Sequence, residues 1–466
     1  MPLPSKWLTL IFLWLYGQSA YAQFESIYAF ESPLGEYPYG SLIYDGQFLY
    51  GTSFHGGQST NCLNDNCGVV FRILPDGSGY TILHAFDEDD GAFPRAALVM
   101  VSDTLYGMTF KGGKYHVGTI FKIHKNGSGF SHMFSFSDSS GTYPKGSLIY
   151  VDSFLYGMTL SGGASDDGVI FSIKPNGTQF KILHAFNTPV TGGGPYADLV
   201  SDGTWFYGTT YGGGLHDKGV VFKILHDGSG YTKLLDFDND IGINSWGNLL
   251  IDSTYLYGMT YNGGEYGYGV VFRIRNDGTN FSKLHDFDGD HGSHPEGSLT
   301  LFRSKLYGVT HWGGTTNDCS FECGVLFSLN TDGSGYNALY HFNETTGSDP
   351  KAAVTIVPPY LYGITYQGGA HKMGTIYRFG LHNTVDNGMT NAITVYPNPV
   401  NAQLVISGTN ALGEVLLYDM TARVVFRSGT AAETTSLDLS TLSDGPYLLN
   451  YFDGVSAYFR TVIMKL

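Results

Sequence analysis

Charged residues, and cations in particular, are scarce in this chain. Only 14% of its 466 residues are charged, and 25 Lys and Arg stand against 41 Asp and Glu, for a formal net charge of −16. This balance repels phosphate backbones and anionic lipid, so it argues against nucleic acid or a membrane surface as a partner. No run beyond the N-terminal region is apolar enough for a membrane-spanning helix.

Common enzyme motifs are absent too. The sequence contains no G-x-S-x-G, no H-E-x-x-H and no phosphate-binding glycine loop. Helical periodicity of useful length is also missing. The chain has instead 64 glycines and 15% aromatic residues. This composition is typical of many short strands joined by glycine turns, and its aromatic content excludes a disordered chain.

Residues 1–22 have the features of a secretory signal peptide. Lys6 precedes a short apolar run from Trp7 to Tyr16, and Ala20-Tyr21-Ala22 is a small-x-small cleavage site. Cleavage there leaves Gln23 as the first mature residue. An uncleaved anchor is the alternative, but the apolar run is too short to span a bilayer.

A repeat dominates the rest of the chain. The motif L-Y-G-x-T or a close variant occurs seven times, with spacings of 56, 50, 51, 50, 50 and 55 residues. Its tyrosines are Tyr50, Tyr106, Tyr156, Tyr207, Tyr257, Tyr307 and Tyr362. Each unit predicts four short strands, the last two joined by Asp-Gly or Asn-Gly, which favours a tight hairpin. A four-stranded unit of this length is typical of a propeller blade.

The two ends of the repeat region predict a closed ring. The seventh unit stops after residues 374–379 and lacks a fourth strand, whereas an unpaired strand, Ser26 to Phe30, precedes the first unit. We therefore predict an all-β fold in which residues 23–382 form a seven-bladed β-propeller and the N-terminal strand closes the last blade. A linear solenoid is the alternative, but it would need polar caps at its ends.

The four cysteines lie in two insertions that explain the two long spacings. Cys62 and Cys67 lie in the first unit, and Cys319 and Cys323 in the sixth. An even count in an exported chain predicts disulfides, each closing its own loop. A metal site built from all four is the alternative. It is disfavoured because units one and six are not neighbours in a ring and the C-x2-C spacing usual for zinc is absent.

Two variable positions in each unit predict a ligand site. One follows the proline that leads into each first strand, and in a propeller it would ring the mouth of the central channel. The other precedes Gly-Gly. Aromatic rings stack on sugar rings and polar neighbours bind hydroxyls, although these rings could equally serve blade-to-blade packing. The ligand-binding candidates are Tyr39, Tyr196, Trp246, Tyr211, Tyr261, His311, Trp312 and Tyr366.

Catalytic and metal-binding predictions are weaker. Glu296 and His294, facing Arg95 and Lys145 across the channel mouth, are the candidates for acid–base chemistry. We expect no cofactor and no metal. Calcium in the acidic loops is the open alternative, but no loop has a full calcium pattern and a solvated acidic rim accounts for them better. These loops are residues 87–90, 236–240 and 286–290.

The last part of the chain differs from the repeats. Residues 383–393 have the composition of a linker, and the alternating strands of residues 394–466 predict a small β-sandwich. This tail closely resembles the type A sorting domain of the type IX secretion system of Bacteroidota. The match rests on Tyr396, Pro397, Asn398, Pro399, Gly445, Tyr447 and Lys465. It departs at Ala422 and Pro446, usually glycine and a β-branched residue.

The resemblances bear on location more than on activity. The tail implies the type IX machinery as partner, export through the periplasm, and a protein at the cell surface or secreted. The repeats resemble the GloVer tandem repeats of bacterial surface proteins, which carry no assigned activity. The sequence thus favours a binding module for a polysaccharide or other surface ligand. A polysaccharide lyase or glycosidase acting at the channel mouth, and a structural or adhesive surface protein, are the alternatives.

Overall fold

The computed structural model describes two units separately. Residues 1–381 form one compact unit and residues 382–466 the other. The described residues are 24–59, 62, 66–316, 319 and 323–381 in the first unit, and 394–396, 403–407, 414–418, 424–429, 434–452 and 458–465 in the second. The expected signal peptide and linker, and Pro397, Asn398 and Pro399, lie outside them.

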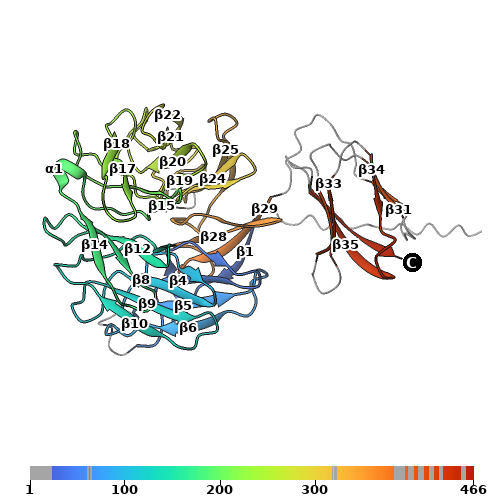
Figure 1. The fold of residues 1–466 in the computed structure, drawn as a ribbon, viewed down its shortest axis with the longest axis horizontal. Coiled ribbons are helices and arrows are strands. Elements are labelled where there is room, and N and C mark those ends of the chain that lie inside the picture. Colours follow the sequence, from blue (N-terminus) through green and yellow to red (C-terminus); the bar gives the residue numbers. More distant parts are fainter. Residues whose placement is uncertain are drawn as a thin grey trace, which may run out of the picture. The chain divides into compact units, whose positions relative to one another are not determined.

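The first unit is a seven-bladed propeller built from seven antiparallel sheets (Figure 1). The strands of blades 1 to 3 are β2 (Glu36–Pro38), β3 (Ile43–Tyr44), β4 (Leu49–His55), β5 (Val69–Ile73), β6 (Thr81–Ala85), β7 (Val99–Val101), β8 (Thr104–Thr109), β9 (Thr119–His124), β10 (Ser131–Ser135), β11 (Ile149–Val151), β12 (Phe154–Thr159), β13 (Val169–Ile173) and β14 (Lys181–Ala185). Those of blades 4 to 6 are β15 (Val200–Ser201), β16 (Trp205–Thr209), β17 (Val220–Leu225), β18 (Thr232–Asp236), β19 (Leu250–Ile251), β20 (Tyr255–Thr260), β21 (Val270–Arg275), β22 (Ser282–Asp286), β23 (Thr300–Phe302), β24 (Lys305–Thr310), β25 (Val325–Asn330) and β26 (Asn337–His341).

The seventh blade joins the two ends of the propeller. It contains β27 (Thr355–Val357), β28 (Tyr360–Thr365) and β29 (Thr375–Gly380), and β1 (Phe24–Ala29) pairs antiparallel with β29 (Figure 1). The predicted closure by the N-terminal strand is confirmed. Among the described residues the single α-helix is α1 (Thr188–Thr191), and none is long and apolar enough to span a membrane.

Both faces of every blade are buried against a neighbour. Seven hydrophobic clusters each combine residues of two adjacent blades, including blade 7 with blade 1. Alternate residues of one strand therefore belong to different clusters: Phe71 packs towards blade 7 and Val70 towards blade 2. The glycine of the repeat motif is part of this packing, because a Cβ on Gly107 would lie 2.5 Å from Phe121 Cζ.

The two predicted disulfides are present, Cys62–Cys67 and Cys319–Cys323, each inside its own loop. In the second unit, one sheet holds β30 (Thr394–Tyr396), β31 (Gln403–Ser407) and β34 (Thr434–Asp438). The other holds β32 (Glu414–Tyr418), β33 (Val424–Gly429), β35 (Gly445–Phe452) and β36 (Tyr458–Lys465). Residues of both sheets share one hydrophobic cluster, as expected of a small β-sandwich.

Near the start of each blade, a set of side chains links neighbouring blades. The backbone N–H of Ala97 donates to Ser147 Oγ at 3.0 Å, and that of Asn248 to Ser298 Oγ at 2.7 Å. Blade 7 reaches blade 1 in the same way, from Ala353 N–H to Ser41 Oγ at 3.0 Å. In the same way, the backbone N–H of Ser147 donates to the Asp198 carboxylate, and the backbone N–H of Asp198 donates to Asn248 Oδ1. We call this set the blade ladder.

The blade ladder is interrupted where the acceptor position is alanine, at Ala97 and Ala353. We expect Ala97→Ser to supply an acceptor for Ser41 N–H and to raise the unfolding free energy by about 0.5–1.5 kcal/mol. The reverse change, Ser147→Ala, should cost about 1–3 kcal/mol because Ala97 N–H loses its acceptor. Denaturant unfolding of both variants tests this. Equal stability of Ala97→Ser and the parent would show that the interruption has no energetic consequence.

Candidate functional site

Seven side chains, one from each blade, meet at one mouth of the propeller. They follow the proline, or Ser245, that leads into each first strand. This mouth ring consists of Tyr39, Arg95, Lys145, Tyr196, Trp246, Glu296 and Lys351. The first six line a common cavity of about 40 Å³. We name the side of the propeller that carries these residues, together with the loops between the second and third strands, the mouth face.

A repeated backbone turn positions the ring. Two residues before each ring member, the chain adopts a left-handed conformation with φ between 52° and 62°. The N–H of this turn residue donates to a carbonyl in the preceding blade at 2.8–3.1 Å. Phe93 donates to Cys67 O and Asp349 to Cys323 O, so each disulfide holds a loop that supports the next ring residue. Because few non-glycine residues adopt this conformation, its recurrence marks a conserved geometry of the turn within the chain.

Glu296 is buried and bound by three neighbours. Tyr39 OH donates to its Oε2 at 2.7 Å, and Lys351 Nζ lies 3.5 Å from its Oε1. His311 Nδ1 lies 2.9 Å from the same Oε1, although the ring N–H points poorly towards it. Burial raises the pKa of this carboxyl, but His311, Lys351 and Tyr39 outweigh burial and lower the pKa from 4.5 to about 2. Glu296 is therefore a permanent carboxylate and cannot donate a proton near neutral pH.

The cations on the other side of the ring contact aromatic rings instead of carboxylates. The Arg95 guanidinium carbon lies 5.0 Å from the ring centre of Tyr39 and 4.8 Å from those of Phe54 and Phe110. Lys145 Nζ lies 3.5 Å from the ring centre of Tyr196. Burial, reinforced by the charges of Arg95 and Lys351 and opposed by Glu296, lowers the pKa of Lys145 from 10.5 to about 7.

The predicted aromatic candidates form an arc across blades 4 to 6. Trp246 is stacked between Tyr261 at 4.2 Å and Tyr196 at 5.3 Å, which occupies both of its faces. Tyr211 packs tilted against Tyr196 and is 39% exposed. Trp312 extends the arc from His311, at 4.7 Å, to Tyr261, at 6.2 Å. On the other side, Tyr366 lies 5.9 Å from Tyr39 and 4.7 Å from Lys351 Nζ.

Glu296 and His294, the two candidates for acid–base chemistry, make different contacts. His294 is itself a left-handed turn residue, and its ring packs 4.9 Å from both Tyr261 and Trp312. His311 contacts Glu296 instead. Two buried carboxyls were not predicted from the sequence. Burial raises the pKa of Asp349 and also that of Asp198, which belongs to the blade ladder. A polar residue two positions after five of the seven ring members is the signal that could have identified Asp198.

Carboxylates of the acidic loops accept backbone N–H groups, both within these loops and from the neighbouring loops between second and third strands. Asp87 and Asp90 each accept the other's backbone N–H, and Asp238 accepts those of Asp240 and Ile241. Within the described ranges, one group of three potential ligand atoms comes together, from Cys62, Cys67 and Glu88. Both of its sulfurs belong to a disulfide, so they are not thiolate ligands for a metal.

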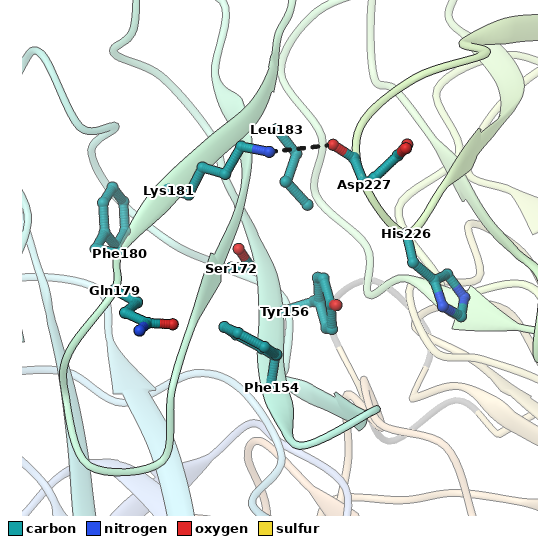
Figure 2. Close-up of a pocket in the computed structure, with 9 residues that line it drawn as sticks. All are labelled: Phe154, Tyr156, Ser172, Gln179, Phe180, Lys181, Leu183, His226 and Asp227. Atoms are coloured by element: carbon teal, nitrogen blue, oxygen red, sulfur yellow. Dashed lines mark hydrogen bonds between the residues drawn. The ribbon is translucent and has the colours of Figure 1, made fainter.

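A second cavity of about 350 Å³ lies between blades 3 and 4 (Figure 2). It lies on the side of the propeller that carries the hairpins between third and fourth strands, which we name the hairpin side. It is lined by Phe154, Tyr156, Ser172, Gln179, Phe180, Lys181, Leu183, His226 and Asp227, and Lys181 Nζ donates to Asp227 O across it at 3.3 Å. The repeat explains this cavity. In four other blades, the position of Ser172 holds a long cation above an aromatic ring, such as Arg72 at 4.5 Å from Phe48 or Arg273 at 4.8 Å from Tyr255.

We expect Ser172→Arg to fill this cavity and stabilise the fold. The new guanidinium would lie on Phe154, a cation–π contact worth about 0.5–1 kcal/mol, which thermal unfolding can measure. Ser328→Arg is the matched control, because Ser328 occupies the same position in blade 6, where Lys305 stands at the position that corresponds to Phe154. Equal effects of the two changes would contradict this explanation.

The low pKa of Lys145 predicts a specific dependence of stability on pH. With a pKa of about 7 in the folded protein and 10.5 as its ordinary value, the unfolded chain binds more protons between these limits. The penalty that Lys145 imposes on folding therefore decreases progressively as the pH rises from about 7 to 10. We expect the stability of the wild type relative to Lys145→Met to increase over this range in denaturant titrations. The exposed Lys114→Met is the control, and a pH-independent difference for Lys145→Met would disprove the assignment.

Family models match both units. Residues 16–211 and 190–377 match the Gloeobacter/Verrucomicrobia repeat, and residues 394–465 match a secretion system C-terminal sorting domain. No curated protein matches the chain. Solved structures with a similar fold include PorZ of the type IX secretion system of Porphyromonas gingivalis, at 14% identity and a TM-score of 0.48, with 94% of this chain and 60% of that one covered.

Two further structures share the propeller architecture. The extracellular domain of a proposed one-component system from B. thetaiotaomicron has 11% identity and a TM-score of 0.53, with 94% of this chain and 54% of that one covered. Oligogalacturonate lyase from Vibrio parahaemolyticus has 12% identity and a TM-score of 0.52, with 78% and 94% covered. At these identities the likeness extends to the fold alone. The tail directs export by the type IX machinery, to the cell surface or beyond. The chain belongs to the Gloeobacter/Verrucomicrobia repeat family, and a type IX sorting domain follows its propeller in the sequence.

Proposed function

We propose that the protein is a surface or secreted binding module that recognises a polysaccharide on its mouth face. The observation that carries this proposal is the gathering of exposed apolar side chains on that face. Among the described residues, Tyr115, Tyr211, Leu215, Tyr266 and Tyr268 are 39–76% exposed, and all lie in or just before the loops between second and third strands. Exposed aromatic residues clustered on one face of a rigid scaffold mark an interaction surface.

The cavity volume limits how a glycan could bind. About 40 Å³ is close to the volume of one or two waters and far below that of usual ligand pockets. A sugar ring would therefore lie on the mouth face and not enter the channel. Trp246 has both faces stacked, so Tyr211, with an exposed ring beside the aromatic arc, is the better platform.

The full-length mature chain, screened on a polysaccharide array, tests the proposal. We expect binding without cleavage products, and a loss of about tenfold or more in affinity for Tyr211→Ala, corresponding to about 1.4 kcal/mol. Tyr150→Ala is the matched control, because Tyr150 is 38% exposed but lies at the turn between the first two strands of its blade. If neither variant lost affinity, the glycan site would lie elsewhere on the protein. If the wild type bound no polysaccharide, a structural or adhesive role would be favoured.

One observation favours a polysaccharide lyase as second candidate. A lysine with a pKa of about 7 beside an arginine can take a proton at neutral pH while the arginine neutralises an acidic sugar. An increase in ultraviolet absorbance from unsaturated products, lost in Lys145→Met, would establish the enzyme.

We further propose that residues 1–22 are a cleaved signal peptide and that the source belongs to the Bacteroidota.

A further inference from the structure

Three side chains that carry N–H donors, Arg95, Lys145 and Trp246, line the mouth cavity. Each of them contacts aromatic rings. Arg95 Nε and Trp246 Nε1 are buried, and neither has a hydrogen-bond acceptor in the part of the chain that the structure describes. The contacts of the Lys145 ammonium are the rings of Tyr196 and Phe110. A buried donor without an acceptor costs free energy, so such a group points to something that binds there.

The carboxylate that lines the same cavity does not meet this need. Glu296 is bound by Tyr39, Lys351 and His311, on the other side of the ring from Arg95 and Lys145. The mouth ring thus carries three cationic residues and one carboxylate, in a chain whose formal net charge is −16. This local excess of cations would attract an anion in spite of the charge of the whole chain.

The size of the cavity restricts that anion to a single small group. A volume of about 40 Å³ is enough for a carboxylate but not for the ring that bears it. An exposed aromatic surface surrounds the opening, with Tyr211 at 39% exposure. A ligand with a carboxylate on a sugar ring would satisfy both features at once.

We propose that the mouth cavity binds the carboxylate of an acidic polysaccharide, with Arg95, Lys145 and the Trp246 indole as donors. This inference rests on the proposed glycan binding and names its ligand class. Arg95 and Lys145 supply the charge, and Trp246 donates from its ring edge, which its stacking on Tyr196 and Tyr261 leaves unused. The sugar ring lies outside the cavity, on the mouth face.

Binding should be coupled to protonation of Lys145. The charged groups that act on its ammonium are Arg95, Glu296 and Lys351, and burial together with the two cations lowers its pKa to about 7. An entering carboxylate adds a negative charge and favours the protonated form. Affinity for an acidic glycan should therefore fall as the pH rises from about 6 to 9, and Lys145→Met should remove most of this dependence.

Calorimetry on the mature full-length chain, at constant ionic strength, provides the test. The probes are polygalacturonate, alginate and hyaluronan, each against its methyl ester, together with free acetate. We expect at least one free acid to bind at least tenfold tighter than its ester, and Arg95→Gln to abolish that preference. Arg72→Gln is the matched control, since Arg72 also lies over an aromatic ring but on the hairpin side.

The outcomes separate the two proposals. Equal binding of acid and ester, or binding of neutral glycans alone, would overturn the carboxylate site and leave glycan binding intact. Binding of acetate without any polysaccharide would establish an anion site and refute the sugar ligand. If the folded wild-type protein bound none of the probes, both the carboxylate site and the proposed glycan binding would be overturned.

Discussion

Closure of the ring is the constraint on which the rest of the structure depends. Each blade is apolar on both faces, because its strands contribute alternate residues to two different clusters. A blade with a free face would expose one whole cluster to water. Seven blades leave no free face only if the last one is complete, and β1, pairing with β29, completes it. The cluster between blades 7 and 1 then contains Phe30, from the beginning of the chain, and Tyr362, from near the end of the repeats.

The same closure makes the mouth geometry regular. Every blade presents the same left-handed turn, bonded to the blade before it, and two residues later a side chain that enters the ring. A single backbone geometry thus positions seven chemically different side chains. The two disulfides support this arrangement at Cys67 and Cys323, whose carbonyls accept the N–H groups of the turns before Arg95 and Lys351.

The ring is electrostatically divided. On one side, Glu296 is buried among partners that keep it ionised, which makes it part of the structure. On the other, Arg95 and Lys145 lie against aromatic rings, where burial and mutual repulsion keep the pKa of Lys145 low. Glu296 offsets this repulsion only in part, and perturbed pKa values cluster at functional sites. This division distinguishes residues that hold the mouth together from those available to a ligand.

Much of the fold and of the mouth ring could be predicted from the sequence, because the same local pattern recurs in seven units. The spacing of the tyrosines, the unpaired first strand and the extra residues around the cysteines determined the blade count, the closure and the disulfides. They also placed Tyr39, Arg95, Lys145, Tyr196, Trp246 and Glu296 around one channel, since equivalent positions at the inner edge of each blade surround the axis of the ring. The tail motif determined the route of export.

Only the tertiary structure decided how those side chains pair. Neighbours around the ring come from different blades, about fifty residues apart, so their contacts do not follow from local sequence. His294, Glu296 and His311 belong to one blade, and the orientation of the side chains there decides that His311 reaches Glu296. Nor could the sequence show that Trp246 has both faces covered, that a cavity lies beside Ser172, or that Arg95 and Lys145 lie over aromatic rings. Pairing, burial and pKa depend on the distances between blades, and those distances exist only once the ring has closed.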